Sequence, residues 1–517
     1  MRRVALLGGS ALALVAFSNG SAYAGCNSGN VANTVLITDA ACQGNAAGAD
    51  TTAIGAGANA PNAGATAIGD SASAGVGGSS DGDTAVGFFT TATGVGSDAA
   101  VAVGSFATAV GGGATALGND VTANGAGAVA LGGDDPVNGG TQATGAATTA
   151  VGAGATSSAA NATSLGNNAL ASGISSTAIG SGGPSSRQTI AAGGFSTAIG
   201  TGNQVIAGAT GGTAIGDNND VTGSFGTAIG NFNSAAGANS IAIGSLSQGL
   251  ASSSTAIGNA ALANGANAVA MGTLATASGT SSLAFGNGAR ATATSATAIG
   301  TGSSATGVNA IAIGTGATAT GSVAIGAAAS AANGGAAFGD GAVATGTNAT
   351  AVGPNTSATF ANSTAIGNGA AATSANQIAL GTATNTYRAA GINSAASLAA
   401  QTGPVRAVTT DAAGNLATAA FASQQDVSGL QSNISTLQGQ MRQAFEGTAI
   451  AVAMGGSALP ENKKFAISTN WGTFRGENAM SLTGLVRVSN NVVLNGGFGA
   501  GFQQGGVAGR AGVTVAW

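Results

Sequence analysis

A short phrase of alternating side chains recurs along most of the chain and ends each time in glycine. It occurs 23 times between residues 52 and 381, often as Thr-Ala-Ile-Gly, for example at 213–216 and 227–230. From Gly216 to Gly314 the closing glycines are spaced 14 residues apart without exception. A fixed period of this length indicates stacked coils, each of which buries its apolar face only against its neighbours.

The alternation within the phrase predicts short strands. The residue before the closing glycine is apolar in every copy, as in Ile54, Ile68 and Phe285. Strand side chains alternate between two faces, so we expect this apolar residue to point into a core. A second glycine often follows seven residues later, as at Gly237 and Gly265. Each unit is therefore predicted to hold two strands and two turns, as one coil of a parallel β-solenoid.

Some coils are longer than 14 residues. The extra residues, at 75–83, 133–141 and 182–195, are expected to form loops that bulge from a coil. Such loops often carry function, but insertions in a turn are also tolerated at little cost. The sequence leaves both interpretations open.

After residue 381 the period changes. Residues 405–418 read as a small hairpin or connector. A 3-4 spacing of apolar residues then predicts a short coiled coil, with an ordinary amphipathic helix as the alternative. The core positions of this coiled coil are Val427, Leu430, Ile434, Leu437 and Met441. From Gly447 to Gly456 the side chains are small, which suits a helix in a narrow space.

Beyond residue 464, four segments of about 11 residues alternate apolar with small or polar residues. Strands of this length and pattern are typical of an outer-membrane barrel. Trp517 stands at the terminus of the last strand, where an aromatic girdle residue would lie. Four strands cannot close a barrel, and open sheet edges are not tolerated in lipid. The anchor is therefore predicted to be shared: two chains would give about 8 strands and three about 12.

The N-terminus is predicted to be a secretory signal. Arg2 and Arg3 precede an apolar stretch at 4–17, and cleavage is expected after Ala24. Cys26 and Cys42 are predicted to form a local disulfide, as is common in exported chains. A lipoprotein signal at Cys26 is the alternative.

Composition narrows the function classes. The chain has 6% charged residues, 4% aromatic residues and no histidine, so the side chains of most catalytic sites are scarce. We predict no enzyme activity and no cofactor. Asp70, Asp217 and Asp340 follow a closing glycine, but calcium β-rolls use a nine-residue repeat, and no metal site is predicted. The net charge of −5 argues against nucleic acid as a partner.

The repeats followed by this C-terminal region resemble the YadA-like family of trimeric autotransporter adhesins (type V secretion). The resemblance implies a homotrimer with a left-handed parallel β-roll head, a short coiled-coil stalk and a 12-stranded outer-membrane barrel that exports its own chain. It places the anchor in the outer membrane and the head and stalk on the cell surface. The expected domains are a signal peptide (1–24), an N-terminal cap (25–50), head repeats (51–385), a neck (386–422), the stalk (423–446) and the membrane anchor (447–517).

One family motif transfers to this chain. Head repeats of a collagen-binding member resemble Asn-Ser-Val-Ala-Ile-Gly-x-x-Ser, and one repeat here matches with isoleucine in place of valine. The matching residues are Asn239, Ser240, Ile241, Ala242, Ile243, Gly244 and Ser247. The expected function is attachment to host matrix such as collagen, to other cells or to surfaces. The alternative is a self-association or biofilm fibre without a specific receptor.

Overall fold

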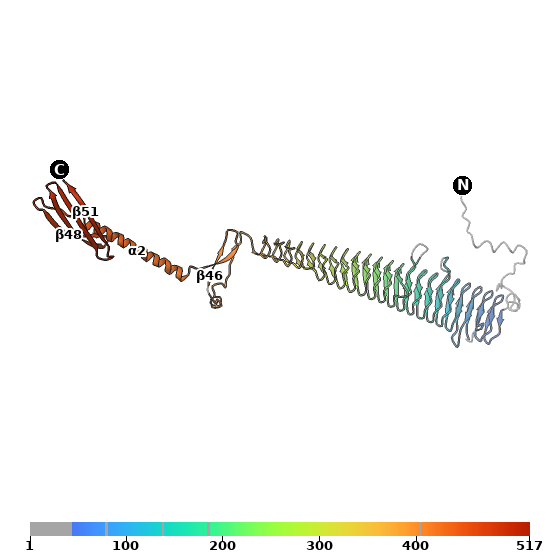
Figure 1. Cartoon of the computed structure of the whole chain (residues 1–517). Helices are drawn as coiled ribbons and strands as arrows, with labels where there is room; N and C mark the ends of the chain where they lie inside the picture. The colour runs from blue at the N-terminus through green and yellow to red at the C-terminus, as the bar shows by residue number, and fades with distance from the viewer. Residues whose placement is uncertain (1–43, 78–80, 137–138, 183–186, 404) are drawn as a thin grey trace, which may run out of the picture. The chain divides into compact units, whose positions relative to one another are not determined.

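The computed structural model describes residues 44–77, 81–136, 139–182, 187–403 and 405–517 (Figure 1). The predicted signal peptide and the predicted disulfide between Cys26 and Cys42 fall on residues outside these ranges. The described chain forms two compact units that divide between Thr386 and Tyr387.

The first unit is a parallel β-solenoid. One strand of each coil comes from the glycine-ended phrase, and these strands form a sheet of 23 from β2 (Thr52–Ile54) to β45 (Ile378–Leu380). The other strand of each coil lies in a 22-stranded sheet from β1 (Asn45–Ala46) to β43 (Ser357–Ala358). Successive coils pair in parallel and in phase, so that Thr213 lies beside Thr227 and Gly216 beside Gly230. The predicted solenoid with its 14-residue coils is confirmed.

Alanine fills the core of these coils. The alanine in the middle of the phrase is fully buried in coil after coil, as at Ala214, Ala228 and Ala256. The prediction that the apolar residue before the glycine points into the core is wrong. Ile54 is 46% exposed and Phe285 is 50% exposed. The two sheets of a short coil lie too close together for large side chains, so the large residues point outward and the small one points inward.

The closing glycine is required by close stacking of the coils. Gly216 has a φ of +120°, and a Cβ built on it would lie 2.0 Å from the carbonyl oxygen of Gly230. The same approach recurs one coil later, where a Cβ on Gly230 would lie 1.9 Å from the oxygen of Gly244. No other residue fits both this backbone conformation and this spacing.

The extra residues of the longer coils form connections between strands, but the third predicted range, 182–195, also includes the strand at Ile190–Ala191, so the third insertion ends earlier than predicted. The insertions connect β5 (Ser73–Ala74) to β6 (Thr84–Val86), β12 (Val129–Gly132) to β13 (Gln142–Ala143), and β18 (Thr177–Ile179) to β19 (Ile190–Ala191). Pairing continues in phase on both sides of the third insertion, where Ala178 lies beside Ala198. The insertions therefore leave the solenoid register unchanged.

The second unit begins with short elements. α1 (Ala395–Ala399) precedes an antiparallel hairpin of β46 (Arg406–Thr410) and β47 (Leu416–Ala420). The predicted hairpin is confirmed. α2 (Gln424–Ala453) follows as one continuous helix of 30 residues. Its N-cap is Ser423, which forms a reciprocal capping box with Asp426.

Four antiparallel strands in chain order complete this unit: β48 (Phe465–Phe474), β49 (Glu477–Ser489), β50 (Val492–Gly501) and β51 (Val507–Val515). The four predicted strands are confirmed. One face of the sheet packs on α2 through Ala449, Ile450, Met454 and Ala479. The other face exposes large apolar side chains, among them Phe465, Ile467, Trp471, Leu482, Leu494 and Phe498.

A glycine permits the contact between helix and sheet. A Cβ on Gly472 of β48 would lie 2.2 Å from the carbonyl oxygen of Ala449 and 2.6 Å from the backbone nitrogen of Ala453. The backbones of α2 and β48 therefore touch at this point. None of the helices in the described ranges has the length and apolarity needed to cross a membrane.

Candidate functional site

The residues of the candidate ligand-binding repeat divide between the interior and the surface of one coil. Ser240, Ala242 and Ser247 are buried. Ser247 is structural, because its Oγ donates to the carbonyl oxygens of Ile243 and Gly258 at 3.0 and 2.5 Å. These three side chains are not accessible to a ligand in the folded coil.

The rest of this repeat faces outward. Asn239 is exposed in a turn with a φ of +57°, and Ile241 and Ile243 are half-buried on the outer face of the 23-stranded sheet. Gly244 closes the coil with a φ of +131°. Four of the seven candidate residues thus remain available for contact, and none of them carries a charge.

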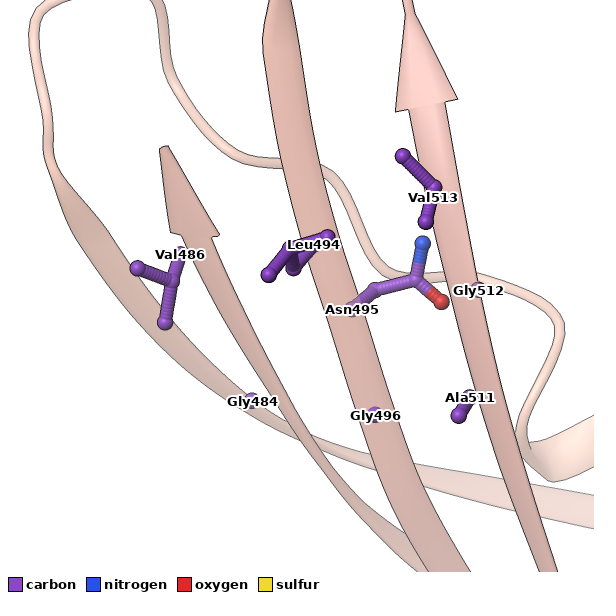
Figure 2. A pocket seen from close by; sticks show the side chains of 8 residues that line it. All are labelled: Gly484, Val486, Leu494, Asn495, Gly496, Ala511, Gly512 and Val513. Carbon is purple, nitrogen blue, oxygen red and sulfur yellow. The ribbon is translucent and has the colours of Figure 1, made fainter. Parts of the chain in front are cut away.

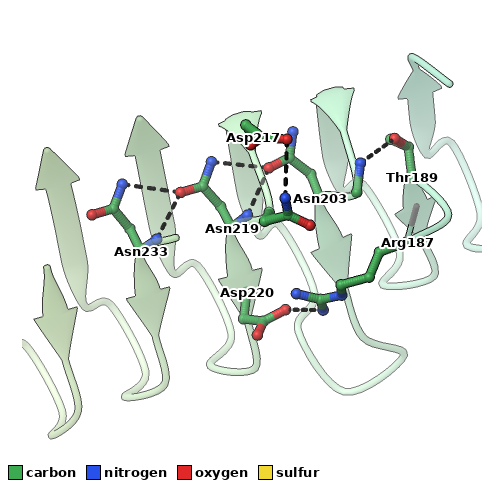
Figure 3. Close-up of polar contacts among 9 residues, drawn as sticks. Arg187, Thr189, Asn203, Asp217, Asn219, Asp220 and Asn233 are labelled. Atoms are coloured by element: carbon green, nitrogen blue, oxygen red, sulfur yellow. Dashed lines mark hydrogen bonds and ion pairs between the residues drawn. The ribbon is translucent and has the colours of Figure 1, made fainter. Parts of the chain in front are cut away.

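A buried polar ladder of Asn203, Asn219 and Asn233 runs along the solenoid (Figure 3). Asn219 donates from its Nδ2 to the Oδ1 of Asn203 at 2.9 Å, and its own Oδ1 accepts from the Nδ2 of Asn233 at 3.0 Å. The Oδ1 of Asn233 accepts in turn from the backbone N–H of Ser247 at 2.9 Å. The amides saturate one another and the turn carbonyls, so this ladder is structural and leaves no polar atom for a ligand.

Beside this ladder, an inserted loop is tied to the surface of the head. Arg187, three residues before β19, forms an ion pair with Asp220 (Figure 3). Both side chains remain partly exposed, at 37% and 44%. The contact joins residues 33 positions apart in the chain and holds this end of the insertion against later coils.

Exposed phenylalanines at turn tips are the feature that the sequence reasoning missed. Phe89, Phe106, Phe195, Phe225 and Phe232 all have a φ between +51° and +58°, and each is at least half exposed. A bulky residue in this left-handed region is a genuine outlier that costs about 1–2 kcal/mol. Most other coils place asparagine, serine, alanine or glycine at these turn positions, and Leu246 and Leu274 are the other large residues there. A large apolar residue in place of a small or polar one was the signal that the sequence offered.

Two of these rings form an aromatic cluster with Phe88. Phe89 and Phe106 stack with ring centroids 5.8 Å apart and an interplanar angle of 5°. Phe88 lies edge-on to both, at 4.5 and 5.5 Å. The cluster therefore presents ordered aromatic surface on two neighbouring coils.

The predicted coiled-coil positions lie on α2 and are exposed in the single chain. Val427, Leu430, Ile434, Leu437 and Met441 are 47–63% exposed. The helix that carries the 3-4 spacing is therefore present, with its apolar stripe uncovered by the rest of the described chain.

Farther along α2, polar contacts join the helix to the turns of the sheet. Arg442 donates from Nε to Glu477 at 2.9 Å. Glu446 is fully buried and accepts from the backbone N–H groups of Gln503 and Gln504 at 2.8 Å and of Gly506 at 3.0 Å. Arg442 and Glu446 of α2 thus tie the helix to the start of β49 and to the turn before β51. Trp517, the predicted barrel terminus, is fully exposed.

The sheet also has a shallow depression (Figure 2). It is lined by Gly484, Val486, Leu494, Asn495, Gly496, Ala511, Gly512 and Val513. The glycines lack side chains that would fill it, and Asn495 lies over Gly512, whose Cβ would meet the Oδ1 at 2.9 Å. Within the described ranges, no three acidic, histidine or cysteine side chains gather closely enough to hold a metal ion.

Comparison with known families gives two matches. The YadA head domain repeat matches at residues 46–72, 98–120, 143–169, 157–182, 222–247, 251–275, 263–289, 277–303, 291–317, 305–329, 332–356 and 344–370. The YadA-like membrane anchor domain matches residues 458–517. No curated protein sequence matches the chain.

The two matches coincide with the two structural features described above. The head repeats fall on the solenoid, and the anchor domain falls on the four-stranded sheet. The anchor domain places the chain in the outer membrane with its head exposed at the surface. The chain belongs to the YadA-like family of trimeric autotransporter adhesins.

Proposed function

We propose that three copies of the chain assemble through their anchors into one 12-stranded barrel that exports its own passenger. The observation that carries this proposal is the open sheet: β48 and β51 each pair on one side only within the described chain. Unpaired strand edges are not stable in lipid, so the edges need partners. The family of the anchor domain supports three copies.

The same symmetry explains two apolar surfaces outside the anchor. Three copies of α2 would bury the stripe from Val427 to Met441 in a coiled coil. Three left-handed solenoids would cover the outward row that includes Ile54 and Phe285. We include both contacts in the proposal, because rows this long are rarely left in water.

The head, in this proposal, attaches the cell to matrix proteins such as collagen, to other cells or to surfaces. The strained phenylalanines support an attachment role, because exposed aromatic residues contribute strongly to protein interfaces. The part of the candidate repeat that lies outside that covered row, Asn239 with Ile241, is a second contact surface. Family members are adhesion and structural proteins rather than enzymes, and the proposal needs no catalytic residue or cofactor.

Self-association without a receptor remains a second candidate function. The observation that favours it is the scarcity of charge and of tyrosine and tryptophan, which limits specific recognition. The two functions differ in whether binding saturates on one matrix protein or occurs between cells alone.

The test displays the full chain on Gram-negative cells and measures their binding to collagen, fibronectin, laminin and bare plastic. Saturable binding to one protein supports a receptor adhesin. Replacing Phe89 and Phe106 with asparagine should reduce that binding, while an Asn239→Ala, Ile241→Thr variant tests the candidate repeat. Cell aggregation without matrix binding would favour the fibre. A chain that lacks residues 447–517 should not reach the surface, and its display would overturn the anchor assignment.

A further inference from the structure

We propose that Glu446 is the residue that stops α2 at one axial position in the anchor when export ends. This inference rests on the proposed self-export. The head side of α2 faces outward, because the helix N-terminus leads to the surface-exposed head. Export therefore draws the helix outward along the sheet, and something must fix where it comes to rest.

The contacts of Glu446 are specific to one position. Three backbone N–H groups of the 502–506 turn converge on its carboxylate, two on Oε1 and one on Oε2. Convergent backbone N–H groups form an anion-binding nest. Gly501 leaves the space for this side chain, since a Cβ there would lie 2.0 Å from the Cδ of Glu446.

A second set of contacts acts at the same end of the sheet. Arg442, one helical turn earlier, pairs with the nearly buried Glu477 at the start of β49. The rings of Phe445 and Phe474 lie 5.8 Å apart, and the guanidinium of Arg475 lies 5.3 Å from the Phe445 ring. Both hairpin turns at this end therefore hold the helix.

The apolar contacts alone would not prevent α2 from sliding outward along the sheet by one helical turn. Residues four apart occupy the same face of a helix, one turn or about 5.4 Å apart. An outward shift of one turn would place Ala453 where Ala449 lies and Met454 where Ile450 lies. Both exchanges are compatible with the glycine-lined sheet, where Ile450 and Met454 already lie against Gly499.

The polar contact forbids that same shift. It would place Ile450 in the position of Glu446 and leave the N–H groups of Gln503, Gln504 and Gly506 without their carboxylate. Hydrogen bonds to a carboxylate are stronger than those to a neutral acceptor, and the Ile450 side chain offers no acceptor to replace them. An inward shift would press the Glu446 charge against Gly499 among apolar atoms, which is costly as well. The carboxylate therefore selects one register from several that the small residues allow.

The experiment reads this register in the full chain by disulfide formation between Ser457→Cys and Ser468→Cys. The two Oγ atoms are 2.6 Å apart, so the pair should close in the native register. A displacement of about one turn would take the pair beyond disulfide reach. Membranes are oxidised, and the linked peptides are quantified by mass spectrometry. The head on intact cells is measured in parallel with an antibody.

Glu446→Gln should lower the disulfide yield by about tenfold, the shift expected when charge-assisted hydrogen bonds that fix one of two registers are lost. Gly501→Ala should act in the same direction, because its methyl group would displace the carboxylate. The head should remain displayed in both variants. Glu461→Gln, at an exposed position in the same anchor, is the matched control and should retain the yield of the parent chain.

A parental yield in both Glu446→Gln and Gly501→Ala would overturn the inference. Absence of both variants from the outer membrane would also contradict it, because a contact made at the end of export is not needed for insertion. If one variant fails to insert, the other decides. Failure of the parent chain to display its head would count against self-export, and the disulfide yield would still report the register.

Discussion

The buried asparagines show what an alanine core demands of a polar residue. Asn219 is fully buried between two coils. Its Nδ2 donates to the Oδ1 of Asn203 and to the carbonyl oxygens of Ile215 and Gly230, at 2.8 to 3.0 Å. Each asparagine thus pairs with the next coil and with its own turns. A core so poor in large side chains gains cohesion from this saturated ladder.

Asn219→Ala should destabilise the middle of the head. The change removes the acceptor of the Asn233 backbone N–H and the side-chain donor to the carbonyl groups of Ile215 and Gly230. An interrupted set of buried hydrogen bonds costs about 1–3 kcal/mol. The measurement is hydrogen exchange in the full chain, followed on β22 (Thr213–Asp217), β24 (Thr227–Asn231) and β26 (Ile241–Ser245).

The control is Asn231→Ala, which removes an exposed asparagine bonded only at the surface to Asp217. It should leave exchange almost unchanged. Equal effects of the two substitutions would show that the ladder contributes no more than a surface contact.

At the residue scale, the sequence correctly predicted which residues of successive coils stack on one another, but it was misleading about which side chains point into the core. The glycine spacing predicted which residues stack, and Gly216 does lie beside Gly230. It could not show that Ala256 is buried while Ile257 lies on the outer face. Hydrophobicity alone favours isoleucine as the core residue, and the narrow interior that reverses this choice exists only once both sheets are built.

At the scale of the element, α2 depends on its first turn for a defined start. Ser423 donates from its Oγ and its backbone N–H to the carboxylate of Asp426 at 2.7 and 2.8 Å, and its Oγ accepts from the Asp426 N–H. The hydrogen bond from the Ser423 side chain, followed by that from its backbone, lowers the pKa of Asp426 below its ordinary value of 3.8. The box is thus tied to the charged form of the carboxylate.

The first turn of α2 should therefore loosen in acid. A lowered folded pKa gives a stabilising contribution that is full above the ordinary value and is lost as the pH falls through the folded pKa. Protection factors of amides 424–428 in the full chain should fall several-fold between about pH 6 and about pH 2.5.

The Ser423→Ala variant should show low protection at both pH values, because the box is already broken. Ser435→Ala, in the helix interior, should behave as the parent chain. A pH response that survives in Ser423→Ala would mean that another group controls the helix start.

A second prediction at the element scale concerns the contact between α2 and β48. Gly472→Ala would set a methyl group 2.2 Å from the Ala449 carbonyl oxygen, inside van der Waals contact with a backbone atom. The helix would have to move, so we expect the heat stability of the assembled anchor to drop by about 1–3 kcal/mol. Gel mobility of unboiled and heated outer membranes measures it.

Gly484→Ala on β49 is the matched control, because its new Cβ would meet nothing closer than 3.9 Å. Equal loss of heat resistance in both variants would argue that any side chain in the sheet, rather than contact with the helix, is responsible.

The four strands themselves were predictable from their alternation. The glycine under the helix was not, since a sequence does not show which strand residue meets the helix backbone.

At the scale of the whole molecule, the head behaves as a one-dimensional stack in which each coil depends on its two neighbours. Ile257 lies beside Met271, which lies beside Phe285, so one coil offers the next the same partners that it received. This continuity explains why the three insertions do not disturb the pairing of the coils that follow them. It also means that the length of the head is set by coil number rather than by any unique contact.

Removal of one whole coil should therefore be tolerated. Deleting residues 259–272 places Ile257 beside Phe285 and keeps both sheets continuous, and the full chain should remain displayed and as resistant to limited proteolysis as the parent. Deleting residues 259–265 removes β29 (Leu262–Ala263) alone. β27 (Gln248–Gly249) would then lack its next partner, and the phase of every later coil would shift by half a period. A head that resists protease equally after both deletions would contradict the coil as the unit of stability, because only the 14-residue deletion preserves the pairing of both sheets.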